Sequence, residues 1–324
     1  MIDAIRRLAT DCGFDAVGAV RLNLDALPFS DTAFQAWLDA GFSAGMEYMA
    51  NRREAFADPR LVLSEVRCVL VLGVRFQTLE TTAGKLPTHV PLIHATCEHL
   101  PGHGRVAHYA ASGRDYHDLI RSQLKELQKG LKALFPDSIS RGVVDTAPLH
   151  ERDLARKAGL GFRGRNRMLI HPTWGSRLFL AAVLTSAELP EFREFPEELL
   201  KQKEAACAHC GRCLAACPTG ALGETGVDAR RCLSYLTIEH RGEIPPELAR
   251  RMGHQLFGCD ACTDCCPHNA AFREDASAFL ELEPILNMDE AEFRAVFAHS
   301  PFLRCKLEGM QRNARIVVEN KEHP

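Results

Sequence analysis

The stretch CAHCGRCLAACP, residues 207–218, decides how this sequence is interpreted. Its cysteines follow the spacing C-x2-C-x2-C-x3-C-P, which is typical of bacterial ferredoxins that bind [4Fe–4S] clusters. The two-residue gaps let one tight loop place three thiolates on three irons of a cube. The fourth cysteine, before Pro218, begins a new segment and points to a second cluster. A second run, C-x2-C-x3-C-P, spans residues 259–267, so the two runs predict a small ferredoxin-like domain with two clusters.

Two cubane clusters need eight thiolates, and the two runs supply seven, so Cys232, which lies between them, is the natural eighth ligand. The crossed ligation of two-cluster ferredoxins then predicts two ligand sets. One set consists of Cys207, Cys210, Cys213 and Cys266. The other set consists of Cys217, Cys232, Cys259 and Cys262. Cys265 remains an alternative to Cys266, because Cys262 and Cys265 are also two residues apart, but the proline after Cys266 favours Cys266.

Zinc is the alternative metal for these cysteines, since zinc sites also use C-x2-C pairs. Zinc normally takes four ligands in two pairs, and this does not explain the spacing C-x2-C-x2-C-x3-C-P. We therefore expect iron–sulfur clusters. The chain has 324 residues and 13 cysteines, nine of them between residues 207 and 266. A secreted disulfide scaffold would be shorter and would spread its bridges through the fold.

The composition predicts a cytosolic globular protein of about two domains. Hydrophobic residues make up 46% and charged residues 25%, which excludes disordered and fibrous classes. The net charge of −3 gives no overall nucleic-acid signature, so any basic surface must be local. The first residues, MIDAIRRLATDC, include Asp3 and have no continuous apolar core, unlike an export signal. The longest apolar runs of the chain are too short to cross a bilayer. We therefore expect neither an export signal nor a membrane partner.

The hydrophobic pattern predicts an α+β fold in three parts. Residues 1–195 form the first domain, with a buried strand over 66–76 and a long amphipathic helix over 115–135. We also expect a helix over 149–158, and a hairpin that joins 168–170 to 177–185. Residues 196–275 form the cluster domain, and 276–324 form a short helical tail. Gly159, Gly161 and Gly164 match G-x-G-x-x-G, but a helical pattern precedes them and a strand-like one follows, which argues against a dinucleotide site.

Long motifs in the sequence resemble the cobalamin-dependent epoxyqueuosine reductases of tRNA modification. They include AHYAASGRDYH (107–117), VVDTAPLHERDLARKAGLGFRGRNRMLI (143–170), GSRLFLAAVLT (175–185), CAHCGRCLAACPTGAL (207–222), VDARRCLSYLTIEHRGEIP (227–245) and GCDACTDCCPHN (258–269). The resemblance runs from about residue 10 to about residue 270 and implies a nitroreductase-like α/β sandwich that binds cobalamin. It implies reduction of the epoxide of epoxyqueuosine to an alkene in a tRNA anticodon loop, with electrons passing from the two clusters to a base-off cobalamin.

The resemblance places the proton donor at Asp145, in the motif Asp-Thr-Ala-Pro. A carboxyl group can protonate a departing oxygen only if it is itself protonated, so we expect burial to raise its pKa. The alternative is that Asp145 caps the following helix, since this motif is good capping sequence. The resemblance favours the catalytic role.

The resemblance also implies further cofactor contacts. These residues are Asp115, Tyr116, His108, Arg165, Asn166 and Ser234. For Asp115 and Tyr116 the alternative is a helix start with the tyrosine in the core. Six positive charges between residues 152 and 167 either form a solvated face or contact phosphate.

Histidines are frequent between residues 77 and 108, and they include His89, His94, His99 and His103. A surface loop is the expected structure there, and a zinc site that also uses Cys97 is the alternative.

We expect a monomer with tRNA and an unidentified electron donor as partners. Longer family members end in HEAT-like repeats that help to bind tRNA. We therefore expect this chain to bind tRNA through a smaller or different surface. Two other functions are considered: a corrinoid reductase of a small molecule, like reductive dehalogenases, and a non-catalytic electron-transfer protein.

Overall fold

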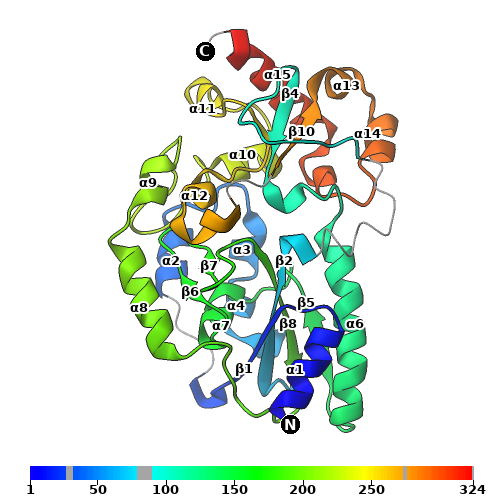
Figure 1. The fold of residues 1–324 in the computed structure, drawn as a ribbon, viewed down its shortest axis with the longest axis vertical. Helices are drawn as coiled ribbons and strands as arrows, with labels where there is room; N and C mark the ends of the chain where they lie inside the picture. Colours follow the sequence, from blue (N-terminus) through cyan, green and yellow to red (C-terminus); the bar gives the residue numbers. More distant parts are fainter. Residues whose placement is uncertain (27–31, 79–89, 273–275, 323–324) are drawn as a thin grey trace. The chain divides into compact units, whose positions relative to one another are not determined.

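A computed structural model describes residues 1–26, 32–78, 90–272 and 276–322 of the chain and divides it into two compact units. The first unit consists of Met1–Leu38, Glu47–Thr82 and Tyr116–Cys210. The second unit consists of Asp39–Met46, Ala83–Asp115 and Gly211–Pro324. Each unit therefore combines segments that are far apart in the sequence, as the mixed ribbon colours show (Figure 1). The division into functional parts at residues 195 and 275 remains a prediction.

The first unit is built on a four-stranded antiparallel sheet of order β1-β2-β8-β5. Its strands are β1 (Ala16–Arg21), β2 (Cys68–Arg75), β8 (Leu178–Thr185) and β5 (Ser140–Val143). The strand expected over 66–76 is confirmed. On β2, Leu70 and Leu72 belong to one hydrophobic cluster while Val69 and Val71 belong to another. Successive side chains of a strand point to opposite faces, so both faces of this sheet are covered.

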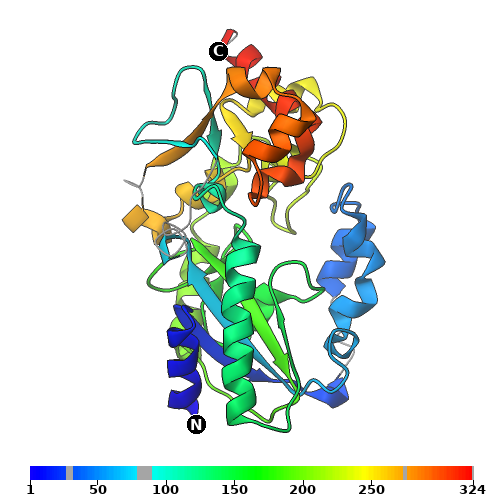
Figure 2. The ribbon, with the colours of Figure 1, turned by 90° about the vertical axis from the view of Figure 1, so that its right-hand side faces the viewer.

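Helices cover the two faces of this sheet. On one face lie α1 (Ile2–Asp11) and α6 (Tyr116–Leu134), which share a hydrophobic cluster with β1, β2 and β8 (Figure 2). The prediction of a long helix over 115–135 is confirmed. On the other face α7 (Glu151–Lys157) packs Leu154 and Ala155 against the sheet. Gly18 on β1 makes this close approach feasible, because a Cβ there would lie 2.3 Å from the Ala158 carbonyl oxygen.

The remaining elements of the first unit are short. They are α2 (Thr32–Asp39), α3 (Glu47–Asn51), α4 (Arg53–Ala57), β6 (Phe162–Arg163), β7 (Leu169–Ile170) and α8 (Glu197–Ala208). The expected hairpin between 168–170 and 177–185 is wrong: β7 pairs with β6, and β8 pairs with β2 and β5. The segment 159–164 follows helix α7 and leads into strand β6, which is the reverse of the order that a dinucleotide site requires.

The second unit contains a four-stranded sheet of order β3-β10-β4-β9. Its strands are β3 (Ile93–Ala95), β10 (Ser277–Glu281), β4 (His103–Val106) and β9 (Gln255–Phe257). The sequence beyond 276 was expected to be helical throughout, and the strand β10 corrects this. Its residues Ala278, Phe279 and Leu280 are all buried, so no alternating pattern marks the strand. Likewise β3 and β4 replace part of the loop expected over 77–107.

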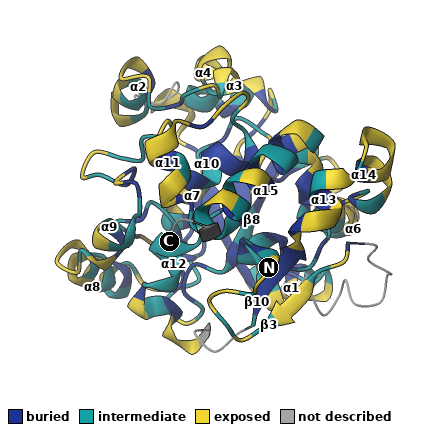
Figure 3. Ribbon diagram, turned by 90° about the horizontal axis from the view of Figure 1, so that it is seen from above, coloured by how far each residue is buried: buried dark blue, intermediate teal, exposed yellow. Residues whose placement is uncertain are grey.

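Helices α13 (Leu282–Asn287), α14 (Glu290–Val296) and α15 (Lys306–Glu322) complete the core of the second unit. Helix α14 is largely exposed and buries mainly Phe293 (Figure 3). Four short helices lie between and beside the cysteines: α9 (Arg212–Ala216), α10 (Leu233–Ile238), α11 (Pro246–Arg251) and α12 (Ala261–Asp264). No helix in the described segments is both long and apolar enough to cross a membrane.

Candidate active site and cluster ligands

Asp145 lies in the loop between strand β5 and helix α7 of the first unit, with its side chain half exposed. The Tyr116 hydroxyl, from the first turn of α6, donates a hydrogen bond to Asp145 Oδ2 over 2.9 Å. His117 Nε2 lies 3.4 Å from the same oxygen, and the His117 ring is buried. The loop thus presents a carboxyl group with one oxygen held by two neighbouring residues of α6 and with access to solvent, so the burial expected for Asp145 is wrong.

The capping alternative for Asp145 is wrong. Helix α7 begins at Glu151, and its N-cap residue is His150, which makes no capping hydrogen bond through its side chain. Asp145 instead has a positive φ of 55°, a conformation that few residues other than glycine adopt. Its backbone N–H donates to Glu151 Oε1 over 2.9 Å.

Glu151 is a feature that the sequence did not reveal. Burial raises the pKa of its carboxyl to about 8, and the nearby Asp145 carboxylate raises it further, against smaller opposing effects of Arg152 and His117. Two carboxyl groups, one of them with a raised pKa, are therefore neighbours here, which is a common arrangement where a protein handles protons. Only their six-residue separation could have suggested the contact, and many acid pairs share that separation.

Tyr116 is held in place by aromatic stacking. Its ring lies 4.3 Å from the ring of Phe179 on β8, at an interplanar angle of 15°. Because β5 also pairs with β8, the loop after β5 and the ring of Tyr116 are both attached to the same strand. The sheet therefore fixes the tyrosine hydroxyl and Asp145 relative to each other.

The second predicted ligand set lies together in the second unit. Burial raises the pKa of the Cys259 thiol to about 12, and Asp260, Cys232 and Cys217 raise it further through their charges. Burial likewise raises the pKa of the Cys262 thiol, and Cys259 and Cys232 are again among the neighbouring charges. The pKa of Cys232 is raised by burial as well, so three of these four partly exposed thiols need a nearby positive charge to become thiolates together, and an iron–sulfur cluster supplies one.

Backbone amides surround the sulfur atoms of this set. Burial alone would raise the pKa of Cys217, but the backbone N–H groups of Leu222, Thr219 and Ala221 hydrogen-bond to its sulfur and lower it. The backbone N–H groups of Tyr235 and Ser234 point in the same way at the Cys232 sulfur. Amides directed at sulfur stabilise thiolates and are a recognised means of tuning iron–sulfur clusters. The donor set therefore fits a cluster, and Ser234 acts here through its backbone beside a predicted ligand.

The first predicted set is divided between the two units. Cys207 and Cys210 belong to the first unit, and the Arg165 backbone N–H donates to Cys207 Sγ over 3.5 Å. Cys213 and Cys266 belong to the second unit and are buried. Cys265 lies near both of them, because burial and the charges of Cys213 and Cys266 raise the pKa of its thiol. The choice between Cys265 and Cys266 as ligand stays open.

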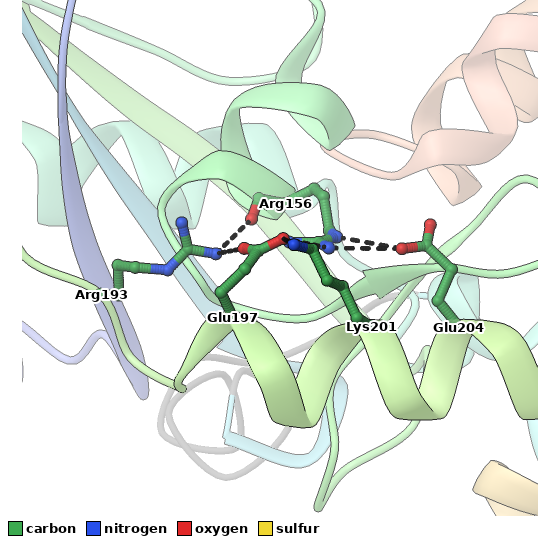
Figure 4. A network of polar contacts seen from close by, with 5 residues as sticks. All are labelled: Arg156, Arg193, Glu197, Lys201 and Glu204. Carbon is green, nitrogen blue, oxygen red and sulfur yellow. Dashed lines mark hydrogen bonds and ion pairs between the residues drawn. The ribbon is translucent and has the colours of Figure 1, made fainter.

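An ion-pair network holds the helix that leads into Cys207. Arg156 on α7 makes two hydrogen bonds of 2.9 Å to the Glu197 carboxylate and two of 3.3 and 3.4 Å to Glu204, both on α8 (Figure 4). Arg193 also binds Glu197, and Lys201 lies 4.0 Å from it. The hydrogen bonds from Arg156 lower the pKa of Glu197 to about 2. The network fixes α8 against α7 and with it the start of the cysteine run.

The basic run between residues 152 and 167 is therefore not a uniform positive face. Arg156 forms an ion pair with Glu197 on α8, and Arg163 forms an ion pair of 2.5 Å with Asp153. The Arg165 guanidinium donates to the Ala208 carbonyl oxygen over 3.1 Å. Arg152, in contrast, lies at the surface.

The other predicted cofactor residues lie in defined positions. His108 is attached to the second cysteine run, since its backbone N–H donates to Asp260 Oδ2 over 2.7 Å and its ring lies 3.4 Å from Asp264. The Asp115 backbone N–H donates to the His299 carbonyl oxygen over 2.7 Å within the second unit. Asn166 is buried in the first unit, and its Oδ1 accepts the backbone N–H of Met168. Their contacts with a cofactor remain a prediction.

The histidine-rich segment shows local contacts. The His99 ring stacks on the His254 ring at 4.0 Å, and His103 Nδ1 lies 2.7 Å from the Pro101 carbonyl oxygen. His89 lies outside the described residues. Within the part of the chain that the structure describes, no group of three His, Cys, Asp or Glu side chains is arranged to hold a single metal ion.

Comparison with known proteins identifies the family. Residues 57–146 match the family model described as "Epoxyqueuosine reductase QueG, DUF1730", and residues 206–269 match "4Fe-4S double cluster binding domain". The epoxyqueuosine reductase of Synechocystis sp. is 35% identical over 297 residues, which cover 88% of this chain and 94% of that protein. The structure of epoxyqueuosine reductase from Streptococcus thermophilus aligns with a TM-score of 0.80 at 25% identity, over 99% of this chain and 81% of that one.

A second solved epoxyqueuosine reductase, in complex with an epoxyqueuosine-modified stem loop of tRNA-Tyr, also aligns with a TM-score of 0.80 and 25% identity, over 98% of this chain and 81% of that one. The predicted mixed α+β fold and the cluster domain are therefore confirmed. With this identity to a relative that it covers almost completely, the chain belongs to the epoxyqueuosine reductase family and is an oxidoreductase of that type.

Proposed function

We propose that this chain reduces epoxyqueuosine to queuosine in a tRNA anticodon loop, with two [4Fe–4S] clusters and a base-off cobalamin as cofactors and Asp145 as the proton donor. The observation that carries the proposal is the Asp145 loop: a half-exposed carboxyl group whose Oδ2 accepts the Tyr116 hydroxyl and lies beside His117. The overall change is epoxide to alkene with loss of water, and it consumes two electrons and two protons.

The residues have distinct roles in this reaction. Asp145 gives a proton to the departing oxygen, and general acids of this kind accelerate such steps by a factor of about 10²–10⁴. The Tyr116 hydroxyl orients the carboxyl and stabilises the carboxylate that remains after proton transfer. When bound, reduced cobalamin would supply a strongly nucleophilic cobalt to the site. The eight predicted cysteines hold the clusters that provide electrons one at a time.

One observation bears on whether the residues fit a corrin. Nη2 of Arg114 is buried and has no hydrogen-bond partner among the described residues. Such a donor suits the amide and phosphate oxygens of cobalamin. Arg114 directly precedes Asp115 and Tyr116, the pair that the family resemblance places near the cofactor. A nitroreductase-like sandwich core in the first unit is part of the same proposal.

The substrate assignment rests on the relatives. A flipped base from a single-stranded anticodon loop is the form of substrate that a buried reducing centre needs. A non-catalytic electron-transfer protein does not fit a chain whose relatives are enzymes over nearly its whole length.

The direct test is nucleoside analysis of tRNA from a host that lacks its own reductase and carries this chain. We expect queuosine to replace epoxyqueuosine. Persistence of epoxyqueuosine with a stably expressed, iron-loaded chain would overturn the proposal. In the same assay Asp145→Asn should remove most turnover while the iron content stays unchanged, and full activity of that variant would remove Asp145 from its role.

A further inference from the structure

The backbone at Asp145 is strained and needs a restraint. A non-glycine residue at a φ of 55° is less stable than in the usual regions by about 1 kcal/mol or more, although aspartate tolerates this conformation better than most residues. The turn is also tight, because the Thr146 N–H donates to the Val144 carbonyl oxygen over 2.6 Å. Such a conformation persists only when the surrounding structure holds it.

Two side chains attach the peptide groups on either side of Asp145. Glu151 Oε1 accepts the Asp145 N–H over 2.9 Å, and Arg52 Nη1 donates to the Thr146 carbonyl oxygen over 2.9 Å. Both attachments lie within the first unit. Of the two contacts, the one with Glu151 joins residues closer in the sequence. It is made to the N–H of Asp145 itself, the residue with the positive φ. It therefore restrains the peptide group that directly precedes the Asp145 side chain.

We propose that Glu151 is a positioning residue for Asp145: its carboxyl accepts the Asp145 N–H and keeps the loop in the conformation that brings the Asp145 carboxyl to the Tyr116 hydroxyl. This proposal rests on the proposed function, in which Asp145 is the proton donor. It assigns to Glu151 no contact with substrate or cofactor.

The environment of Glu151 suits this role. Its carboxyl faces Asp145, Arg152 and His117, and burial, followed by the Asp145 charge, raises its pKa to about 8. Near neutral pH Glu151 is therefore an uncharged acid whose carbonyl oxygen can accept the N–H. An uncharged neighbour also avoids repulsion of the carboxylate that Asp145 becomes once it has given up its proton.

The test compares three variants of the cluster-loaded chain. Glu151→Ala removes the hydrogen-bond acceptor, whereas Glu151→Gln keeps an acceptor oxygen at the same distance along the side chain. Asp153→Asn is the matched control, because it removes an acidic group from the first turn of the same helix and does not touch the loop. Circular dichroism first establishes that each variant is folded.

The first measurement is hydrogen–deuterium exchange of the peptide that covers residues 144–150, which needs no turnover. We expect exchange in Glu151→Ala to be at least tenfold faster than in the wild type, and exchange in Glu151→Gln and Asp153→Asn to be within about threefold of it. The second measurement is steady-state reduction of the tRNA substrate. We expect kcat of Glu151→Ala to fall at least tenfold at nearly constant KM, and Glu151→Gln to recover most of that loss.

Unchanged exchange in Glu151→Ala would overturn the positioning role, and so would a Glu151→Gln variant that is as impaired as Glu151→Ala. If the wild-type chain itself leaves epoxyqueuosine unreduced, the proposed function fails. The exchange measurement then still decides whether Glu151 holds the loop.

Discussion

Replacing Glu151 by glutamine should make the protein more stable at alkaline pH. The pKa of this group is raised from 4.5 to about 8 in the folded chain. A tenfold change in an equilibrium constant corresponds to about 1.4 kcal/mol, so ionisation of Glu151 is harder in the folded state by roughly 5 kcal/mol. Solvent around this partly buried side chain weakens the effect, so we expect at least about 2 kcal/mol of it to remain. Glutamine has the same shape and never ionises.

The sign follows from proton binding. The folded state retains the Glu151 proton up to about pH 8, whereas the unfolded chain releases it near pH 4.5. The stability that this proton contributes is therefore complete below pH 4.5 and is lost as the pH rises through 8. The advantage of Glu151→Gln should be small at pH 5 and should reach about 2 kcal/mol at pH 8. In a unit of this size that corresponds to about 4–8 °C in the unfolding midpoint.

The assay is thermal unfolding of the cluster-loaded chain under anaerobic conditions, followed by circular dichroism at pH 5 and pH 8 with one scan rate. Asp153→Asn is the control, because it removes a charge from the same helix without changing a buried carboxyl. A Glu151→Gln variant that unfolds at or below the wild-type temperature at pH 8 would refute the reasoning, and so would an equal gain in Asp153→Asn.

Three further predictions concern the clusters and the packing. Cys232→Ser should lower the iron content from about eight to about four atoms per chain, measured by iron assay after anaerobic purification, and an unchanged content would exclude Cys232 as a ligand. Gly18→Ala should destabilise the chain by about 1–3 kcal/mol in urea unfolding, because its Cβ meets the Ala158 oxygen at 2.3 Å. Arg156→Met should lower the free energy of unfolding by about 1 kcal/mol at pH 7, and the loss should vanish as the pH falls from 4.5 toward 2, where Glu197 takes up its proton.

The cluster domain, and the grouping of the cysteines within it, could be predicted because their information is local. The spacing of Cys217, Cys259 and Cys262 fixes which sulfurs share a loop, and the count of eight ligands adds Cys232. The structure places these four thiols close enough to influence one another's ionisation. The strand over 66–76 was predictable for a similar reason, since a continuous apolar run of that length is buried on both faces.

Contacts between distant segments were not predictable in this way. Strand β10 contains four consecutive buried residues, so its sequence resembles a short helix as much as a strand, and only pairing with β3 and β4 decides between them. Glu151 gave no signal because its contact with Asp145 depends on a positive φ in the intervening loop. The alternative of a capping role for Asp145 fails for the same reason: the loop turns before the helix begins.

An acid that gives up a proton in each turnover must also recover one. Tyr116 donates to Asp145 Oδ2 and so stabilises the carboxylate, whereas Glu151 keeps its own proton near neutral pH and adds no second charge. These neighbours orient Asp145 without neutralising it, because neither supplies a formal positive charge. The Asp145 side chain is half exposed, so water can reach it directly. If Asp145 is the proton donor, as proposed, we expect the replacement proton to come from solvent, either directly or through His117, whose Nε2 lies 3.4 Å from Asp145 Oδ2. Tyr116 and Glu151 then hold the loop and the carboxyl in place while that proton is delivered.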